Sequence, residues 1–233
     1  MLAVRGLETF YGSSQVLFGV DLDVNEGEVA TLLGRNGMGK TTTINSIMGI
    51  VLPAVGSVRF DGREVARLAS FRTAKHGIGL VPEGRQVFPN LTVHENLVAT
   101  AANRTGAPAP WTAERVYAMF PELEARRRSM GNLLSGGEQQ MLAVGRALMT
   151  NPRLLMLDEA TEGLAPLVRR KIWAALAAIR DSGLAILVVD KNVSDLIRLA
   201  DRHHIIEKGR IVWTGPSADI GRDPGLQQRF LGV

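Results

Sequence analysis

The stretch of sequence that decides the fold is residues 34–41, Gly-Arg-Asn-Gly-Met-Gly-Lys-Thr, which fits GxxxxGK followed by Ser or Thr. A β-branched or alternating run at residues 28–33 precedes it and predicts a strand, and residues 41–48 predict a helix that Gly49 and Pro53 stop. Glycines in such a context let backbone N–H groups converge on phosphate oxygens at a helix N-terminus. We therefore expect a phosphate-binding loop. Its candidate binding residues are Gly34, Arg35, Asn36, Gly37, Met38, Gly39, Lys40, Thr41 and Thr42.

Two carboxylates, Asp158 and Glu159, directly follow an apolar run at residues 154–157. This run predicts a strand buried on both faces, and α/β proteins bind ligands at the carboxyl ends of such strands. With ATP in the phosphate-binding loop, Lys40 is expected to reach the β- and γ-phosphates and Thr41 to ligate Mg²⁺. Asp158 is expected to hold the Mg²⁺ shell, and Glu159 to polarise the attacking water as a catalytic residue.

Strand signals occupy both ends of the chain, and a helical stretch lies between them. Thr112 is the expected N-cap of one helix in that stretch. The runs at 154–157 and 184–189, with a helix between them, predict a βαβ crossover. The predicted strands are residues 2–7, 16–24, 28–33, 58–60, 78–81, 154–157, 184–189, 205–207 and 211–213. The predicted helices are residues 41–48, 93–102, 112–120, 138–149 and 167–180, with a short helix at the C-terminus.

This order of elements predicts an α/β P-loop NTPase with a mixed sheet and an antiparallel β region at the N-terminus. We expect a single domain over residues 1–233. Within it, residues 1–88 and 150–233 are expected to form the nucleotide-binding core, and about residues 89–149 an inserted helical subdomain.

A second anion-binding helix start is predicted at residues 134–140, Leu-Ser-Gly-Gly-Glu-Gln-Gln. With this motif the sequence resembles the ATP-binding cassette (ABC) family over essentially its whole length. The resemblance implies that the signature of one subunit closes over ATP held by the partner's P-loop, with Ser135 and Gly137 acting in trans. A dimer would then hold two composite sites. The signature residues expected at ATP are Ser135, Gly136, Gly137 and Glu138.

Further positions match the same family. Tyr11 stands where the family places an aromatic that stacks on adenine, and an exposed ring beside a turn suits stacking. The alternative for Tyr11 is an aromatic at the edge of the core. Val16 is expected to flank the ribose. Residues 160–166 resemble the D-loop, which lies across the dimer seam in the family; the alternative is an ordinary turn.

Two positions depart from the family pattern. Glu83 stands where most cassettes carry a Q-loop glutamine, and its carboxylate can still approach Mg²⁺ or its water. Lys191 replaces the switch histidine as a candidate catalytic contact to the γ-phosphate; a solvated surface lysine is the alternative. His203 and His204 lie beside a predicted strand without metal-like partners, so we interpret both as structural.

These departures narrow the resemblance to a subfamily. Val-Pro-Glu-Gly-Arg at 81–85, the pair Phe88-Pro89 and the lack of a switch histidine are similar to the smaller ATPase subunit of branched-chain amino-acid importers. The ATPase subunit of urea and short-amide importers is the second candidate, and Glu83 favours the first. The resemblance implies membrane-spanning permease subunits, a second ABC ATPase subunit in a homo- or heterodimer, and, indirectly, a solute-binding protein. A permease helix is expected near Phe88, Pro89 and Leu91.

Composition limits the other function classes. The longest apolar run, residues 184–189, is far shorter than the roughly 20 residues of a membrane-spanning helix. No secretory signal is expected at residues 1–5, and the chain carries no cysteine. We therefore expect a cytoplasmic protein, held at the inner face of the membrane by the permease. The formal charge is +4 and the only dense basic run, residues 126–128, lacks interleaved aromatics, so no nucleic-acid partner is expected.

Two other classes of ATPase share some of these motifs. A cassette ATPase of DNA repair or translation would carry a second cassette, a long coiled coil or a strongly basic surface, and the sequence shows none of them. A small-molecule P-loop kinase would share Lys40 and Asp158 but has no use for the motif at 134–140.

Overall fold

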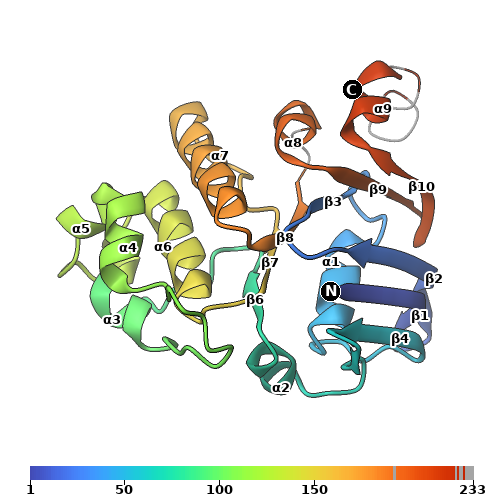
Figure 1. Ribbon diagram of the computed structural model, residues 1–233, viewed down its shortest axis with the longest axis horizontal. Coiled ribbons are helices and arrows are strands. Elements are labelled where there is room, and N and C mark those ends of the chain that lie inside the picture. Colours follow the sequence, from blue (N-terminus) through green and yellow to red (C-terminus); the bar gives the residue numbers. More distant parts are fainter. Residues whose placement is uncertain (191–192, 224, 226–227, 229–233) are drawn as a thin grey trace.

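The computed structural model describes residues 1–190, 193–223, 225 and 228. Two sheets divide the strands between them (Figure 1). One sheet has the order β2-β1-β4-β5, and the other has the order β10-β9-β3-β8-β7-β6. The chain is therefore an α/β protein with one antiparallel and one mainly parallel sheet, as the sequence predicts.

The mainly parallel sheet is the central layer. Every residue of β3 (Val29–Leu33), β7 (Leu154–Asp158) and β8 (Ala185–Val189) is buried, because helices or the second sheet cover both faces. β6 (Ile78–Val81) and β9 (Arg202–Glu207) flank these three strands in parallel, and β10 (Arg210–Pro216) pairs with β9 in antiparallel orientation. This parallel arrangement places the carboxyl ends of β3 and β7 at the same edge.

The antiparallel sheet contains β1 (Leu2–Tyr11), β2 (Ser14–Val24), β4 (Val55–Phe60) and the short β5 (Arg63–Glu64). Helix α1 (Lys40–Ile47) contacts β1 and β2 on one side and β7 on the other, so it lies between the two sheets (Figure 1). Six of its eight residues are buried there.

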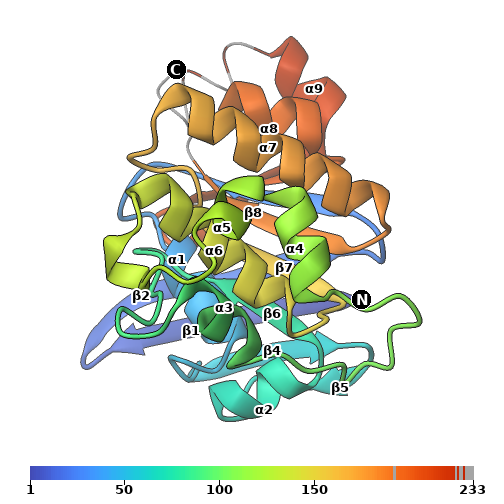
Figure 2. The ribbon, with the colours of Figure 1, turned by 90° about the vertical axis from the view of Figure 1, so that its left-hand side faces the viewer.

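The other helices lie along the parallel sheet and beyond its β6 edge. The described elements between β6 and β7 are all helical. In the view of Figure 2, α4, α5 and α6 lie in front of the sheet and α7 lies above them. Whether this stretch forms a separate subdomain at the expected bounds stays a prediction. These helices are α2 (Ser70–Lys75), α3 (Val93–Val98), α4 (Ala113–Met119), α5 (Pro121–Ala125), the 3₁₀ turn η1 (Gly131–Leu133), α6 (Gly136–Leu148), α7 (Pro166–Asp181), α8 (Val193–Leu199) and α9 (Ser217–Arg222).

Several helix bounds differ from those predicted. Helix α3 ends at Val98 and not at residue 102, because the chain turns to the end of α6, where the Ala102 N–H bonds the Met149 carbonyl at 3.0 Å. Helix α6 begins two residues before the predicted bound, at Gly136, where a capping box starts it. The short helices α2, α5 and α8 were not predicted. The expected cap at Thr112 is confirmed, since its side chain accepts a hydrogen bond from the Arg115 N–H.

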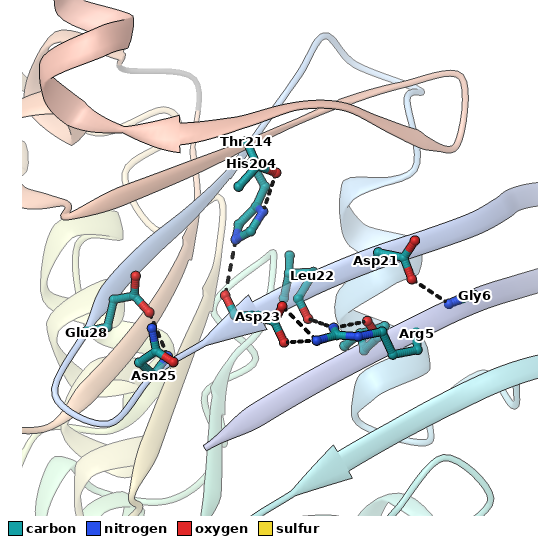
Figure 3. A network of polar contacts seen from close by, with 10 residues as sticks. Arg5, Gly6, Asp21, Leu22, Asp23, Asn25, Glu28, His204 and Thr214 are labelled. Carbon is teal, nitrogen blue, oxygen red and sulfur yellow. Dashed lines mark hydrogen bonds and ion pairs between the residues drawn. The ribbon is translucent and has the colours of Figure 1, made fainter.

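The two histidines of β9 lie in the interior. His203 bonds the Thr31 hydroxyl through Nδ1 at 2.7 Å, and burial lowers its pKa to about 4. His204 bonds the Thr214 hydroxyl through Nδ1, and its Nε2 donates to the Asp23 carbonyl at 3.1 Å (Figure 3). Because Asp23 belongs to β2, His204 joins the two sheets. The structural interpretation of both histidines agrees with these contacts.

Candidate functional site

The loop between β3 and α1 has a conformation that only glycine accommodates at two positions. Gly39 has φ +106°, and a Cβ there would lie 2.8 Å from the Leu17 side chain. A Cβ on Gly34 would overlap the Ile206 carbonyl oxygen. The sequence pattern of this loop therefore has a steric cause. A glycine-rich loop that leads into a helix N-terminus is suited to bind phosphate groups through its backbone N–H groups.

Lys40, the first residue of α1, is only 5% exposed. Its Nζ donates a hydrogen bond to the Arg35 carbonyl at 3.1 Å and lies 4.0 Å from Oε1 of Glu159. The lysine therefore crosses the mouth of its own loop and faces the carboxylate that follows β7. This position brings the predicted phosphate contact and the predicted base to opposite sides of one space.

A cavity of about 440 Å³ lies over the loop. Its volume falls in the usual range of roughly 300–1,000 Å³ for ligand pockets. Most of the loop residues predicted to contact the nucleotide line it, together with one residue of β2 and three carboxylates. The lining residues are Val16, Asn36, Gly37, Gly39, Lys40, Thr41, Thr42, Glu83, Glu159 and Glu162.

The predicted metal ligands lie at the border of a second cavity of about 300 Å³. Thr41 and Glu83 line both cavities, and Asp158 lines the second. The Thr41 hydroxyl donates to Oδ1 of Asp158 at 3.3 Å. Burial raises the pKa of Asp158, the Thr41 hydrogen bond lowers it, and the charge of Glu83 raises it. A half-buried hydroxyl and two carboxylates fit Mg²⁺, which prefers oxygen ligands and shares them with substrate phosphates.

Glu159 follows β7 directly and has a left-handed backbone, with φ +51°. A hydrogen bond to the Glu162 side chain is the largest cause that raises the pKa of Glu159 to about 7, and burial and the Glu162 charge add to it. The neighbouring Lys40 lowers this pKa. A carboxylate with a pKa near neutrality is well matched to a general base.

The signature residues form the start of α6. The Ser135 hydroxyl accepts from the Glu138 N–H at 3.3 Å, and the Glu138 carboxylate accepts from the Ser135 N–H at 2.8 Å. A Cβ on Gly136 would meet the Arg85 guanidinium, and one on Gly137 would meet Val168 at 2.7 Å. The described part of the chain brings none of residues 135–138 into the lining of the cavity over the P-loop. The two predicted phosphate sites, the loop at residues 34–41 and the signature at residues 134–140, therefore do not line one cavity within a single chain.

Among the described residues, four other predicted nucleotide contacts do not line the cavity: Tyr11, Gly34, Arg35 and Met38. Tyr11 is 48% exposed at the end of β1 beside the turn to β2, and it does not line the described cavity. Lys191, the predicted contact to the γ-phosphate, lies outside the described residues.

The sequence interpretation did not assign a role to three features near the site. Glu162 lines the cavity and bonds Glu159; its separation from Glu159 by three residues in a turn was the available signal. The turn between β9 and β10 supports the loop, because the Gly209 N–H donates to the Met38 carbonyl at 3.0 Å. Asp190 bonds the turn after Glu159. Nothing in the local sequence predicts the last two contacts, since they join distant parts of the chain.

Comparison with known proteins gives the family. The model of the family described as "ABC transporter" matches residues 17–162. The chain belongs to the ABC transporter family. This cassette is 38% identical to the high-affinity branched-chain amino acid transport ATP-binding protein BraG of Pseudomonas aeruginosa, over 100% of both chains. It is 34% identical to the lipopolysaccharide export system ATP-binding protein LptB of Escherichia coli K12, over 99% of this chain and 97% of LptB.

Solved structures agree with this assignment. An ATP-binding subunit of an ABC transporter matches with a TM-score of 0.84 and 28% identity, over 100% of this chain and 96% of that one. A dimeric ATP-binding cassette in a post-hydrolysis state, bound to ADP and Pi, matches with a TM-score of 0.80 and 25% identity, over 93% and 99%. The cassette is accordingly a nucleotide-binding ATPase of the ABC type.

Proposed function

We propose that this cassette is the ATP-hydrolysing subunit of an importer and that it drives uptake of branched-chain amino acids. The observation that carries the proposal is the full-length similarity to BraG at 38% identity. The Val-Pro-Glu-Gly-Arg segment at 81–85 and the absence of a switch histidine support it. Uptake of urea or short amides is the second candidate from the sequence. The similarity to LptB at 34% identity makes lipopolysaccharide export a third.

The geometry supports definite roles in hydrolysis. Lys40 binds the β- and γ-phosphates from the mouth of the loop. Thr41 and Asp158 hold Mg²⁺, and Glu83 holds it or its water. When bound, the metal offsets the negative charge of the phosphates. Glu159 orients the attacking water and accepts its proton at the carboxylate, which Lys40 faces from 4.0 Å.

Other residues are proposed to supply the remaining contacts to ATP. Tyr11 stacks on adenine with its exposed ring, and Val16, which lines the cavity, flanks the ribose. Ser135 and Gly137 act in trans at the start of α6, on ATP held by a second cassette. Lys191 contacts the γ-phosphate in place of the switch histidine. The similar dimeric cassette bound to ADP and Pi supports a dimeric assembly.

A permease is the proposed membrane partner. No helix of the described residues is long and apolar enough to cross a membrane. A groove of about 510 Å³ separates the end of α1 from α6, and Arg146 lines it. The Arg146 guanidinium lies 4.0 Å from the ring centroid of Phe88, which is 38% exposed beside Pro89. This apolar edge next to Glu83 suits a permease helix that responds to the nucleotide, and it would hold the cassette at the inner face of the membrane.

The test is transport by the complete assembly. The cassette is purified with candidate permease and second ATPase subunits, and the complex is reconstituted in liposomes with a candidate solute-binding protein. Leucine, isoleucine and valine should stimulate ATP hydrolysis and accumulate only with ATP. Stimulation by urea or acetamide in their place would assign the second candidate, and stimulation by lipopolysaccharide alone would assign the third.

A further inference from the structure

The turn that carries Glu159 is in an unfavourable backbone conformation. Glu159 is not glycine, yet its φ is +51°. Residues with a Cβ adopt this left-handed region at a cost in free energy, and they keep it only where the surrounding structure holds it. The turn begins directly after the buried Asp158, at the edge of the nucleotide cavity. Something in the fold must therefore fix it.

The end of the neighbouring strand β8 supplies that support. Asp158 and Val189 are partners in the parallel register of β7 and β8. The Glu159 N–H donates to the Val189 carbonyl at 2.8 Å, which fixes the first residue of the turn. One residue further along, Oδ2 of Asp190 accepts from both the N–H of Thr161 at 3.1 Å and its hydroxyl at 2.6 Å. Two bonds to one carboxylate oxygen thus fix the third residue of the turn.

This support lies in the interior, where hydrogen bonds to a carboxylate are strong. Asp190 and Thr161 are each 2% exposed. A charged acceptor shortens and strengthens a hydrogen bond, and a low dielectric increases the effect. Valine has the shape of threonine without the hydroxyl, so Thr161→Val removes one of the two bonds and leaves the other possible.

We propose that Asp190 and Thr161 are positioning residues for ATP hydrolysis, because the buried Asp190 carboxylate holds Thr161 and, with it, the left-handed turn that directs the Glu159 carboxylate into the nucleotide cavity. The proposal rests on the role proposed for Glu159. Neither residue lines the nucleotide cavity itself, so they act through Glu159. Displacement of a reacting group by about 1 Å can cost roughly a hundredfold in rate, which makes such support consequential.

The test compares Thr161→Val with Thr161→Ser in the full-length cassette. Thr161→Val should lower kcat by about tenfold or more and leave KM for ATP within about twofold, because the binding loop is untouched. Thr161→Ser keeps the hydroxyl donor and should restore most of kcat. Asp190→Asn keeps an oxygen acceptor, and Asp190→Ala removes it, so the first should be the more active of the two. Thermal unfolding and equilibrium ATP binding are measured for every variant.

A role in stability alone would give another pattern. Equal loss of kcat in Thr161→Val and Thr161→Ser, in step with a lower Tm, would overturn the proposal. Wild-type kcat in Thr161→Val and Asp190→Ala would overturn it as well. Glu159→Gln tests the proposed role of Glu159 as the base separately. If Glu159→Gln is inactive while Thr161→Val has the wild-type kcat, Glu159 remains the proposed base and the positioning role of Thr161 is rejected. If Glu159→Gln hydrolyses ATP at the wild-type rate, the base assignment fails and the proposal with it.

Discussion

Replacement of Glu159 by glutamine is the perturbation that most directly examines the chemistry of the site. Glutamine keeps the size and planarity of the side chain and can still bond Glu162, but it cannot accept a proton from water. The backbone bond from residue 159 to the Val189 carbonyl does not depend on the side chain. The structural change should therefore be small, and the variant should lose hydrolysis rate at the proton-transfer step.

The expected loss is set by the role of the carboxylate. Removal of a positioned general base costs about 10² or more in rate, and a factor of 10² corresponds to about 2.7 kcal/mol in the activation free energy. Affinity for ATP should change little, because the proposed phosphate contacts are the loop and Lys40, and Lys40 keeps its bond to the Arg35 carbonyl. Bound ATP that is not hydrolysed should then accumulate in a closed dimer.

Three measurements follow this variant. Phosphate release gives kcat, equilibrium titration gives the affinity for ATP, and light scattering after size exclusion gives the mass with ATP and Mg²⁺. Thr41→Ala serves as a contrast, because loss of a proposed metal ligand should weaken Mg²⁺-dependent binding as well as turnover. Turnover of Glu159→Gln within about threefold of wild type, where a lost base predicts at least a hundredfold, would refute the assignment.

The remaining predictions concern pH, the loop and the partner surface. The pKa of Glu159 is raised to about 7, and a base acts when deprotonated, so kcat/KM should rise with pH through about 7. Glu162→Gln removes the neighbouring acid and should move this rise to lower pH; an unmoved profile would contradict the pairing. Gly39→Ala should destabilise the folded chain by about 1–3 kcal/mol in chemical denaturation and abolish ATP binding, since φ is +106° there; normal binding would contradict the steric argument. Phe88→Ala should leave basal hydrolysis of the isolated cassette within about twofold but uncouple transport in the assembled complex, and unchanged transport would remove the proposed permease contact.

The sequence predicts the parts of the site that depend on local pattern. The glycine spacing of residues 34–41 and the carboxylates after residues 154–157 each lie within one strand–loop or strand–turn unit, so composition and order suffice to locate them. The motif at residues 134–140 is also local, and the resemblance to the family adds its expected role in trans.

The contacts that the sequence did not predict join distant residues. The bond from Thr161 to Asp190 depends on the pairing of β7 with β8 in one particular register, in which Asp158 faces Val189. The support of Met38 by Gly209 depends on where the last hairpin crosses the loop. Helices α2, α5 and α8 are short, with six, five and seven residues, so each offers at most about two turns in which a helical period could be recognised.

The central claim is that each ATP is bound between the P-loop of one cassette and the signature of another, and complementation in trans is its most direct test. Lys40→Ala disables the loop, Ser135→Arg disables the signature, and each variant alone should be inactive. A mixture forms heterodimers with one intact composite site, so ATP hydrolysis is expected to reappear on mixing. A mixture that stays as inactive as the separate variants, although native mass spectrometry shows the heterodimer, would contradict the claim.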